Sequence, residues 1–349
     1  MTGESDEILS RVDNGIGFVT LNRPKAINSL NQNMVNVLSA VLTEWERDDA
    51  VRAVVLSGAG DRGLCAGGDV VAIYHSARAD GVAARRFWYD EYLLNAQIGR
   101  FGKPYVSLMD GIVMGGGVGV GSHANIRVVT DTTKMAMPEV GIGFIPDVGG
   151  TYLLSRAPGS LGLQVALTGT PFSGADAIAL GFADHYVPHD KLEQFSRTII
   201  DEGVERALAE HAVESPPSGL VAQRGWIDDC YDSLTVADIV AALRSHGAQP
   251  ANDAADVIVT RSPIALSVAL ESVRRAAKLA TLEDVLTQEY RVSCGSLRSH
   301  DLVEGIRAQL VDKDRNPTWS PASLAEVTAP DVEAYFAPAE PDLTFEEKV

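Results

Sequence analysis

The chain has 349 residues, of which 46% are hydrophobic, so it can bury a large core and form one to three domains. Its formal net charge of −18 argues against binding to nucleic acid or to an anionic membrane, and no apolar run is long enough to cross a bilayer. The three cysteines are odd in number and far apart, which predicts neither a disulfide framework nor a zinc site and indicates a reducing, cytoplasmic compartment.

The first half of the chain predicts strands that alternate with helices. Residues 16–21 predict a strand, and Asn31 can cap a helix whose apolar residues recur at helical spacing as far as Trp45. Further strands are expected at residues 53–56, 104–109 and 126–130, with helices over 82–100 and from the glycines at 115–117. This alternation indicates an α/β layered domain with crossover connections.

The second half of the chain predicts mainly helix. Residues 155–183 are expected to be helical with breaks at residues 158–159 and at Pro171, followed by a strand at 183–187 and one helix over 192–208. The pattern stops at residues 214–219 (Glu-Ser-Pro-Pro-Ser-Gly), which predicts a linker. We therefore expect a first domain over residues 1–213 and a mostly helical region with an acidic tail over 214–349, with its clearest helices at 265–279 and 282–292.

Two carboxylates flank a glycine-rich, apolar connection near the middle of the chain. Glu139 and Asp147 lie on either side of residues 140–144 (Val-Gly-Ile-Gly-Phe). A carboxylate in apolar surroundings loses hydration and its pKa rises, so two such acids suit proton transfer or acyl transfer near neutral pH. A surface glutamate is the ordinary alternative for Glu139, although the apolar run favours a functional role. Asp147 can also cap a helix that begins at Val148, and this role is compatible with catalysis.

Two glycine-rich segments precede these acids. Residues 65–69 (Cys-Ala-Gly-Gly-Asp) follow a predicted strand, and residues 114–117 (Met-Gly-Gly-Gly) lie between a predicted strand and a predicted helix. Because glycine lets a ligand approach the backbone, N–H groups at such turns can stabilise an oxyanion, which indicates chemistry at a carbonyl group. Taken alone, the first segment is an ordinary turn in which Asp69 caps a helix, and the second is explained equally well by close helix–strand packing. His185 and His189 have no third ligand nearby, so no metal site is predicted.

These motifs, in this order, resemble the crotonase (enoyl-CoA hydratase/isomerase) superfamily. The resemblance begins at residues 19–30 and continues through 65–69, 110–117, 136–139, 141–143 and 146–150. It implies a spiral core of ββα turns that binds an acyl-CoA, with the thioester oxygen held by the main-chain N–H groups of Gly68 and Gly116. Gly67 and Gly115, beside them, are then expected to contact the substrate. The resemblance implies no metal and no redox cofactor, since CoA is part of the substrate and product.

Two departures from the hydratase pattern narrow the expected reaction. Gly119 stands where hydratases carry their first catalytic glutamate, whereas the second is retained as Glu139, and Asp147 replaces a glycine. The pair of Glu139 with Asp147 resembles the thioesterases that hydrolyse 3-hydroxyisobutyryl-CoA to 3-hydroxyisobutyrate and CoA in valine breakdown. Residues 87–92, 114–121, 299–308, 312–314 and 317–319 share this resemblance, which therefore spans nearly the whole chain. It implies that Glu139 and Asp147 are catalytic and that Glu91 lies near the acyl group.

The resemblance also implies how CoA binds. Arg23 and Lys25 are candidates for its phosphates, and the adenine is expected to meet the main chain of Lys25, Ala26, Ile27 and Ala66. Two other functions stay open. One is a Δ3,Δ2-enoyl-CoA isomerase, which can work with Glu139 alone, or a hydratase-like crotonase, and the other is a non-catalytic acyl-CoA-binding protein. A homo-oligomer is consistent with the resemblance, and the sequence leaves the number of subunits open.

Overall fold

The computed structural model describes residues 7–345, which form two compact units assembled from interleaved segments. Unit 1 consists of Met1–Gly68, Leu93–Met135 and Phe172–Ser218, and unit 2 consists of Asp69–Tyr92, Ala136–Pro171 and Gly219–Val349. Helix α3 (Val82–Gly99) contributes its first part to unit 2 and its last part to unit 1. The domain boundary expected between residues 213 and 214 is a statement about which parts of the chain fold independently, and it stays a prediction.

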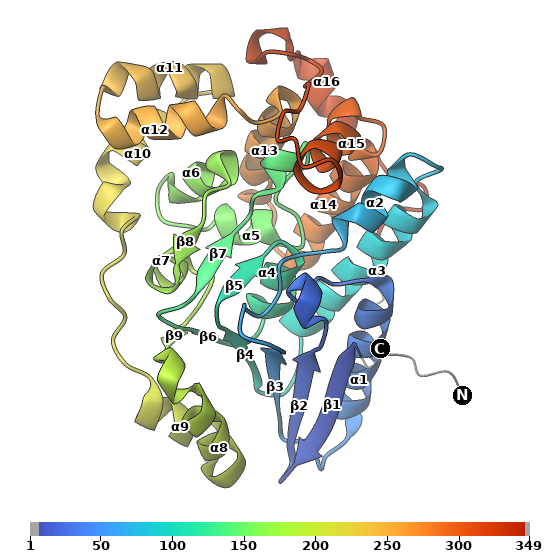
Figure 1. The fold of residues 1–349 in the computed structure, drawn as a ribbon, viewed down its shortest axis with the longest axis vertical. Helices are drawn as coiled ribbons and strands as arrows, with labels where there is room; N and C mark the ends of the chain where they lie inside the picture. Colours follow the sequence, from blue (N-terminus) through green and yellow to red (C-terminus); the bar gives the residue numbers. More distant parts are fainter. Residues whose placement is uncertain (1–6, 346–349) are drawn as a thin grey trace. The chain divides into compact units, whose positions relative to one another are not determined.

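A six-stranded sheet forms the framework of unit 1 (Figure 1). Its order is β1 (Ile8–Asp13), β2 (Ile16–Leu21), β3 (Ala53–Gly58), β4 (Tyr105–Met109), β6 (Ile126–Val129) and β9 (His185–Tyr186). Only β1 runs antiparallel within this sheet, and it pairs with β2 so that Ile8 lies opposite Leu21. All five residues of β4 are buried, as expected for a parallel strand covered on both faces.

A smaller sheet and several helices complete unit 1. The three strands β5 (Ile112–Met114), β7 (Lys134–Ala136) and β8 (Phe172–Ser173) pair in the order β5-β7-β8. Helix α1 (Gln32–Arg47) begins after Asn31, whose side chain accepts a hydrogen bond of 2.9 Å from the Met34 N–H, as predicted. Helices α4 (Gly116–Gly121) and α7 (Gly174–Leu180) follow later in the chain.

The helix expected over residues 192–208 is two helices. Helix α8 (Leu192–Glu202) and helix α9 (Val204–His211) are separated by Gly203, whose φ of +94° interrupts the helical backbone. Both helices bury apolar side chains in the core beside the large sheet, including Phe195, Ile199 and Ala207. The expectation of one continuous helix was therefore wrong.

Unit 2 is helical. It contains the first part of α3 and the following helices: α2 (Val70–Ala77), α5 (Gly150–Leu154), α6 (Leu161–Thr168), α10 (Arg224–Tyr231), α11 (Val236–His246), α12 (Gln249–Ile258), α13 (Pro263–Ala276), α14 (Leu282–Ser296), α15 (His300–Ile306) and α16 (Ala329–Glu333). Ser262 and Thr281 cap α13 and α14, which confirms the two clearest helices expected in this region. The α/β fold with a largely helical C-terminal region is therefore confirmed.

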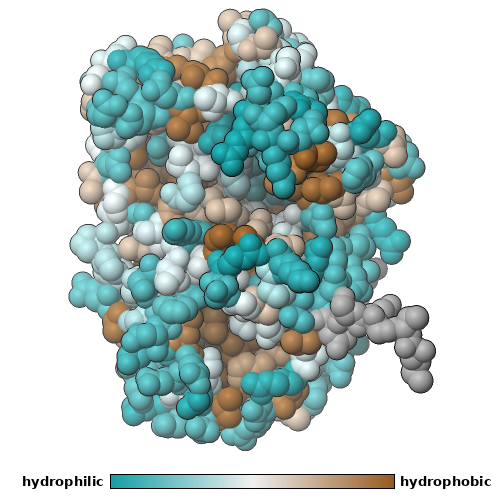
Figure 2. Space-filling view, in the orientation of Figure 1, coloured by the Kyte–Doolittle hydropathy of each residue, from teal (hydrophilic) through white to brown (hydrophobic). Residues whose placement is uncertain are grey.

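The surface mixes polar and apolar residues. On the face shown in Figure 2, the apolar residues form patches separated by hydrophilic ones. Within residues 7–345, no helix has both the length and the apolar character needed to cross a membrane. Cys65, Cys230 and Cys294 are buried free thiols.

Candidate functional site

The two glycine-rich segments predicted from the sequence run side by side in unit 1. The Cys65 N–H donates to the Ile112 carbonyl at 3.1 Å, and the Met114 N–H donates to the Cys65 carbonyl at 2.9 Å. A Cβ atom on Gly117 would lie 2.5 Å from the Cys65 carbonyl oxygen, so this close approach requires glycine. Segments about fifty residues apart in sequence, 65–68 and 114–117, thus form one glycine-lined feature, which we call the glycine loops.

The glycine loops hold two N–H groups for which the described residues provide no hydrogen-bond acceptor. Gly67 has a φ of +111° and Gly115 a φ of +47°, conformations that favour glycine and that set the direction of the following residues, Gly68 and Gly116. Among the main-chain hydrogen bonds of the described residues, none is donated by Gly68 or Gly116, and Gly116 is buried. A buried N–H without an acceptor is costly unless a ligand or water binds it. Both groups are therefore available to a ligand oxygen.

The segment expected to contact CoA lies beside the first glycine loop. Helix η1 (Pro24–Ala26) is followed by Ile27, which has a φ of +48° and whose carbonyl accepts a hydrogen bond of 2.9 Å from the Ala66 N–H. The structure therefore brings Ile27 and Ala66 into contact. Their role in binding CoA stays a prediction.

Arg23 is engaged with its own chain. Its Nε lies 3.3 Å from the Glu7 carboxylate, and its guanidinium donates to the Ser29 carbonyl at 2.6 Å. The Lys25 side chain, by contrast, belongs to an exposed residue. Of the two predicted phosphate ligands, Lys25 is therefore the one whose charge faces solvent.

Unit 2 gathers four buried acids, which we call the acid cluster: Glu91, Glu139, Asp147 and Glu289. Their exposed fractions are 2%, 7%, 6% and 0%. Glu91 comes from α3, Glu139 begins the 3-10 helix η2 (Glu139–Ile142), Asp147 follows in the next loop, and Glu289 belongs to α14. None of the ion pairs among residues 7–345 involves these acids, so their charges are not neutralised by a neighbouring cation.

Aromatic and main-chain contacts within unit 2 hold the acid cluster in place. The Trp88 ring of α3 stacks on Phe144, which follows η2, with ring centroids 5.3 Å apart. Residues 299–308, which share the resemblance to the thioesterases, also pack here. A Cβ on Gly305 of α15 would lie 2.4 Å from the Ile142 carbonyl carbon. Sequentially distant elements therefore fix the turn that carries Glu139.

Burial raises the pKa of every acid in the cluster. For Glu91 and Glu139 the charge of Asp147 adds to the effect of burial. Burial raises the pKa of Asp147 to about 7, although a hydrogen bond from Tyr92 opposes this shift, and burial raises the pKa of Glu289 to about 8. Acids with such values can exchange protons near neutral pH.

The acids differ in how their oxygens are occupied. Glu91 Oε1 and Glu139 Oε2 are buried and have no hydrogen-bond partner among the described residues. Glu289, in contrast, accepts hydrogen bonds from the Gly149 N–H at 2.6 Å, the Thr151 N–H at 3.0 Å and the Thr151 hydroxyl at 2.5 Å. Glu91 and Glu139 can therefore bind a ligand or water, whereas Glu289 stabilises the loop after Asp147.

Asp147 is not a helix cap. The N-cap of α5 is Gly149, with a φ of +78°, and the Asp147 carboxylate instead accepts a hydrogen bond of 2.7 Å from the Tyr92 hydroxyl. The alternative role considered for Asp147 was therefore wrong. Asp69, by contrast, does cap α2, because its side chain accepts a hydrogen bond of 3.3 Å from the Ala72 N–H.

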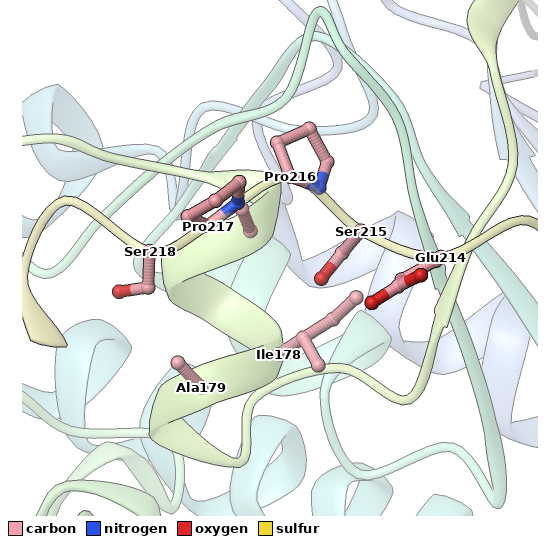
Figure 3. Close-up of a pocket in the computed structure, with 8 residues that line it drawn as sticks. Ile178, Ala179, Glu214, Ser215, Pro216, Pro217 and Ser218 are labelled. Atoms are coloured by element: carbon pink, nitrogen blue, oxygen red, sulfur yellow. The ribbon is translucent and has the colours of Figure 1, made fainter.

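A separate pocket of about 540 Å³ lies in unit 1, under the linker (Figure 3). Ala175, Ile178 and Ala179 of α7 line it together with residues 214–218, and Glu214 and Ser215 point toward Ile178. The pocket contains neither a glycine of the loops nor a member of the acid cluster, so it is distinct from the predicted site. Within residues 7–345, no group of three or more His, Cys, Asp or Glu side chains is arranged to hold a metal.

Comparisons with known proteins agree with these features. The model of the enoyl-CoA hydratase/isomerase family matches residues 16–336. The mitochondrial 3-hydroxyisobutyryl-CoA hydrolases of Danio rerio and Homo sapiens are each 38% identical, over 95% and 96% of this chain and 89% of each relative.

Two solved structures are also similar over almost the whole chain. A carnitinyl-CoA dehydratase from Mycobacterium thermoresistibile is 72% identical with a TM-score of 0.96, covering 99% of this chain and 100% of that one. An enoyl-CoA hydratase from Rhodobacter sphaeroides is 38% identical with a TM-score of 0.92, covering 97% and 100%. The chain therefore belongs to the enoyl-CoA hydratase/isomerase (crotonase) family of acyl-CoA enzymes.

Proposed function

We propose that the protein hydrolyses a short 3-hydroxyacyl-CoA thioester, with 3-hydroxyisobutyryl-CoA as the preferred substrate and 3-hydroxyisobutyrate and CoA as the products. The observation that carries this proposal is the buried pair of Glu139 and Asp147 in one acid cluster, combined with Gly119 at the position of a hydratase's first glutamate. The 3-hydroxyisobutyryl-CoA hydrolases at 38% identity support it.

In this proposal the glycine loops stabilise the oxyanion. The N–H groups of Gly68 and Gly116 donate to the thioester oxygen, while Gly67 and Gly115 allow the acyl group to approach the main chain. These bonds strengthen as the carbonyl carbon becomes tetrahedral, and one such donor typically lowers the barrier by about 3–4 kcal/mol. CoA lies along residues 25–27 and Ala66, with Lys25 and Arg23 as candidate ligands of its phosphates.

Glu139 starts the replacement of sulfur by oxygen in one of two ways. In one route Glu139 takes a proton from water, the water oxygen bonds to the carbonyl carbon, and the carbon–sulfur bond breaks. The proton held by Glu139 then passes through Asp147 to the departing thiolate, which restores both carboxylates. In the other, the Glu139 carboxylate attacks the carbonyl, the thiolate leaves, and water hydrolyses the resulting mixed anhydride. Trapping with hydroxylamine separates the routes, because only the anhydride route can leave a hydroxamate on Glu139, detected by peptide mass spectrometry.

Asp147 and Glu91 position the substrate in both routes. Asp147 accepts a hydrogen bond from the 3-hydroxyl group or from the attacking water, and Glu91 adds a second hydrogen bond to the hydroxyl group. The acyl preference is expected to be moderate, because 3-hydroxypropionyl-CoA differs by one methyl group, which is worth about 1–3 kcal/mol in a pocket.

The second candidate function is dehydration of a hydroxyacyl-CoA. It is favoured by the 72% identity to a protein described as a carnitinyl-CoA dehydratase. Dehydration and hydrolysis leave different products, since only hydrolysis releases a free thiol and only dehydration creates a conjugated enoyl thioester.

One experiment tests the proposal against this alternative. The purified protein is incubated with 3-hydroxyisobutyryl-CoA, 3-hydroxypropionyl-CoA, carnitinyl-CoA and a 3-enoyl-CoA, while thiol release and enoyl absorbance are recorded in parallel. We expect thiol release, fastest with 3-hydroxyisobutyryl-CoA. Enoyl formation from carnitinyl-CoA without thiol release would favour the dehydratase, a shifted double bond in the 3-enoyl-CoA would favour an isomerase, and binding without turnover of any of them would favour a non-catalytic protein.

A further inference from the structure

A chain of three hydrogen bonds leads from Asp147 into the interior of unit 2. The Tyr92 hydroxyl lies 2.7 Å from Asp147 Oδ2 and 2.8 Å from the Ser293 hydroxyl, and Ser293 Oγ lies 2.8 Å from the main-chain carbonyl of Glu289. Tyr92 and Ser293 are both fully buried, with exposed fractions of 0%. Their hydroxyl groups must therefore find their partners within this chain of bonds rather than in bulk water.

The number of hydrogen atoms limits how many of these three contacts can be hydrogen bonds at one time. Each hydroxyl carries one hydrogen, and the Glu289 carbonyl can only accept. When Asp147 is ionised, Tyr92 donates to Asp147, and Ser293 donates either to the Glu289 carbonyl or to Tyr92. When Asp147 carries a proton on Oδ2, Asp147 donates to Tyr92, Tyr92 donates to Ser293, and Ser293 donates to the Glu289 carbonyl. Both hydroxyl groups remain hydrogen-bonded in either state.

We propose that Tyr92 is a positioning residue for Asp147, and that Ser293 lets the Tyr92 hydroxyl reverse its direction so that Asp147 can gain and lose a proton during each turnover. This inference rests on the proposed function, in which Asp147 passes a proton to the departing thiolate. Tyr92 holds the carboxylate from the side of α3, and Ser293 holds Tyr92 from the side of α14.

The surroundings of Asp147 make the Tyr92 hydroxyl important. Glu91 on α3, Glu139 on η2 and Glu289 on α14 all interact electrostatically with Asp147, whose negative charge raises the pKa of each of them. The Tyr92 hydroxyl is the side-chain donor that favours the ionised form of Asp147, since its hydrogen bond lowers the pKa of Asp147 against the larger effect of burial. Removing it should make Asp147 harder to ionise.

The test compares three variants of the full-length protein. In Tyr92→Phe the pH at which kcat/KM reaches half its maximum should move up by roughly one to two units, with kcat near neutral pH lowered about tenfold or more and KM little changed. Ser293→Ala should move the profile in the same direction by less. Tyr231→Phe is the matched control, because Tyr231 is equally buried but its hydroxyl bonds Gln164 rather than the acid cluster.

A second measurement does not depend on turnover. The protein is labelled with ¹³C at the aspartate side-chain carboxyl groups and studied by NMR. The Asp147 signal is the one that is lost in Asp147→Asn. Its titration midpoint should rise in Tyr92→Phe but not in Tyr231→Phe. If the midpoint rises in Tyr92→Phe but the wild-type protein has no thioesterase activity, the proposed function is refuted while the positioning role of Tyr92 is kept. A midpoint and profile matching those of the control would overturn the inference, as would a raised KM with unchanged kcat. If Tyr92→Phe does not fold, Ser293→Ala carries the same comparison.

Discussion

At the scale of single residues, the acid cluster contains acids of two kinds. Glu139 keeps one oxygen unpartnered, whereas Glu289 accepts from three donors. An unpartnered buried carboxylate destabilises the fold once it ionises, but it can act on a substrate. A carboxylate with three donors stabilises its surroundings, but it has less capacity left for a substrate. Similar substitutions at the two positions should therefore have opposite effects on stability.

Glu139→Gln should lower thiol release by about 10²-fold or more, because the amide can neither accept the proton nor attack the carbonyl. The same substitution should weaken the fall of the melting temperature with rising pH, since ionisation of this buried carboxylate destabilises the fold. Asp147→Asn should likewise reduce turnover by orders of magnitude while the protein stays folded. Rates and melting curves measured on the same preparations check both statements, and near-normal thioesterase activity of Asp147→Asn would contradict the proposed role.

Glu289→Gln should destabilise the protein. Its carboxylate faces the N–H groups of Gly149 and Thr151, and an amide would turn an NH₂ group toward at least one of these donors. Leaving a buried donor without an acceptor costs about 1–3 kcal/mol. Urea unfolding at pH 6 measures this loss, and Glu44→Gln, at an exposed position of α1, is the control. An unchanged unfolding free energy for Glu289→Gln would show that these three hydrogen bonds do not stabilise the loop.

At the scale of elements, the glycine loops depend on the contact between α4 and the segment after β3. Gly117→Ala would place a methyl group 2.5 Å from the Cys65 carbonyl oxygen, so the two loops must separate. We expect a loss of about 1–3 kcal/mol of stability and a larger relative loss of kcat, since the Gly68 and Gly116 N–H groups move apart. The control is Gly225→Ala in α10, where nothing lies within 4 Å and the substitution should stabilise the helix by up to about 1 kcal/mol. Denaturation curves and thiol-release rates compare the two.

The elements predicted from the sequence are those whose apolar pattern reflects burial. The buried strand β4 and the capped helix α1 were predicted nearly to their ends. Strand β1 was not predicted, because only Ile8 of its six residues is buried and it carries no alternating pattern. The division of α8 from α9 was missed because apolar spacing continues across Gly203, and only its positive φ reveals the break.

The site was predictable where it consists of short motifs. Glu139, Asp147 and the glycine loops lie in local patterns that sequence reasoning can detect. Tyr92 and Ser293 were not predicted as site residues, because their contact spans 201 positions and each fits the apolar face of its own helix. Glu289 contacts Thr151 across 138 positions, and a single acid in a helical segment gives no signal of such a partner.

At the scale of the whole molecule, two groups of carboxylates make stability depend on pH in opposite directions. Hydrogen bonds from Arg307 lower the pKa of Glu304, and a main-chain hydrogen bond from Ser160 lowers that of Asp228. Such acids stabilise the fold above their unfolded pKa of about 4 and lose this contribution as the pH falls. The acid cluster has raised pKa values, so its contribution is complete below about pH 4 and is lost as the pH rises through the folded values.

Stability should therefore be highest in mildly acidic solution, at about pH 5–6, and should fall toward pH 9. The net charge of −18 at pH 7 strengthens this trend, because self-repulsion grows as the pH rises above the pI near 4.7. Activity should change in the opposite direction, since Glu139 and Asp147 must ionise to act, and the pKa of Asp147 is raised to about 7. Melting temperatures and kcat/KM measured from pH 5 to pH 9 check both trends.

The double variant Glu139→Gln, Asp147→Asn connects the two trends. Removing both carboxylates should flatten the alkaline fall in melting temperature, because each unit of raised pKa is worth about 1.4 kcal/mol of stability lost on ionisation. The remaining slope then measures the contribution of net charge together with Glu91 and Glu289. If the variant's melting temperature falls as steeply as that of the wild type, the loss of stability at high pH comes from general repulsion together with Glu91 and Glu289, and ionisation of the catalytic pair costs the fold little.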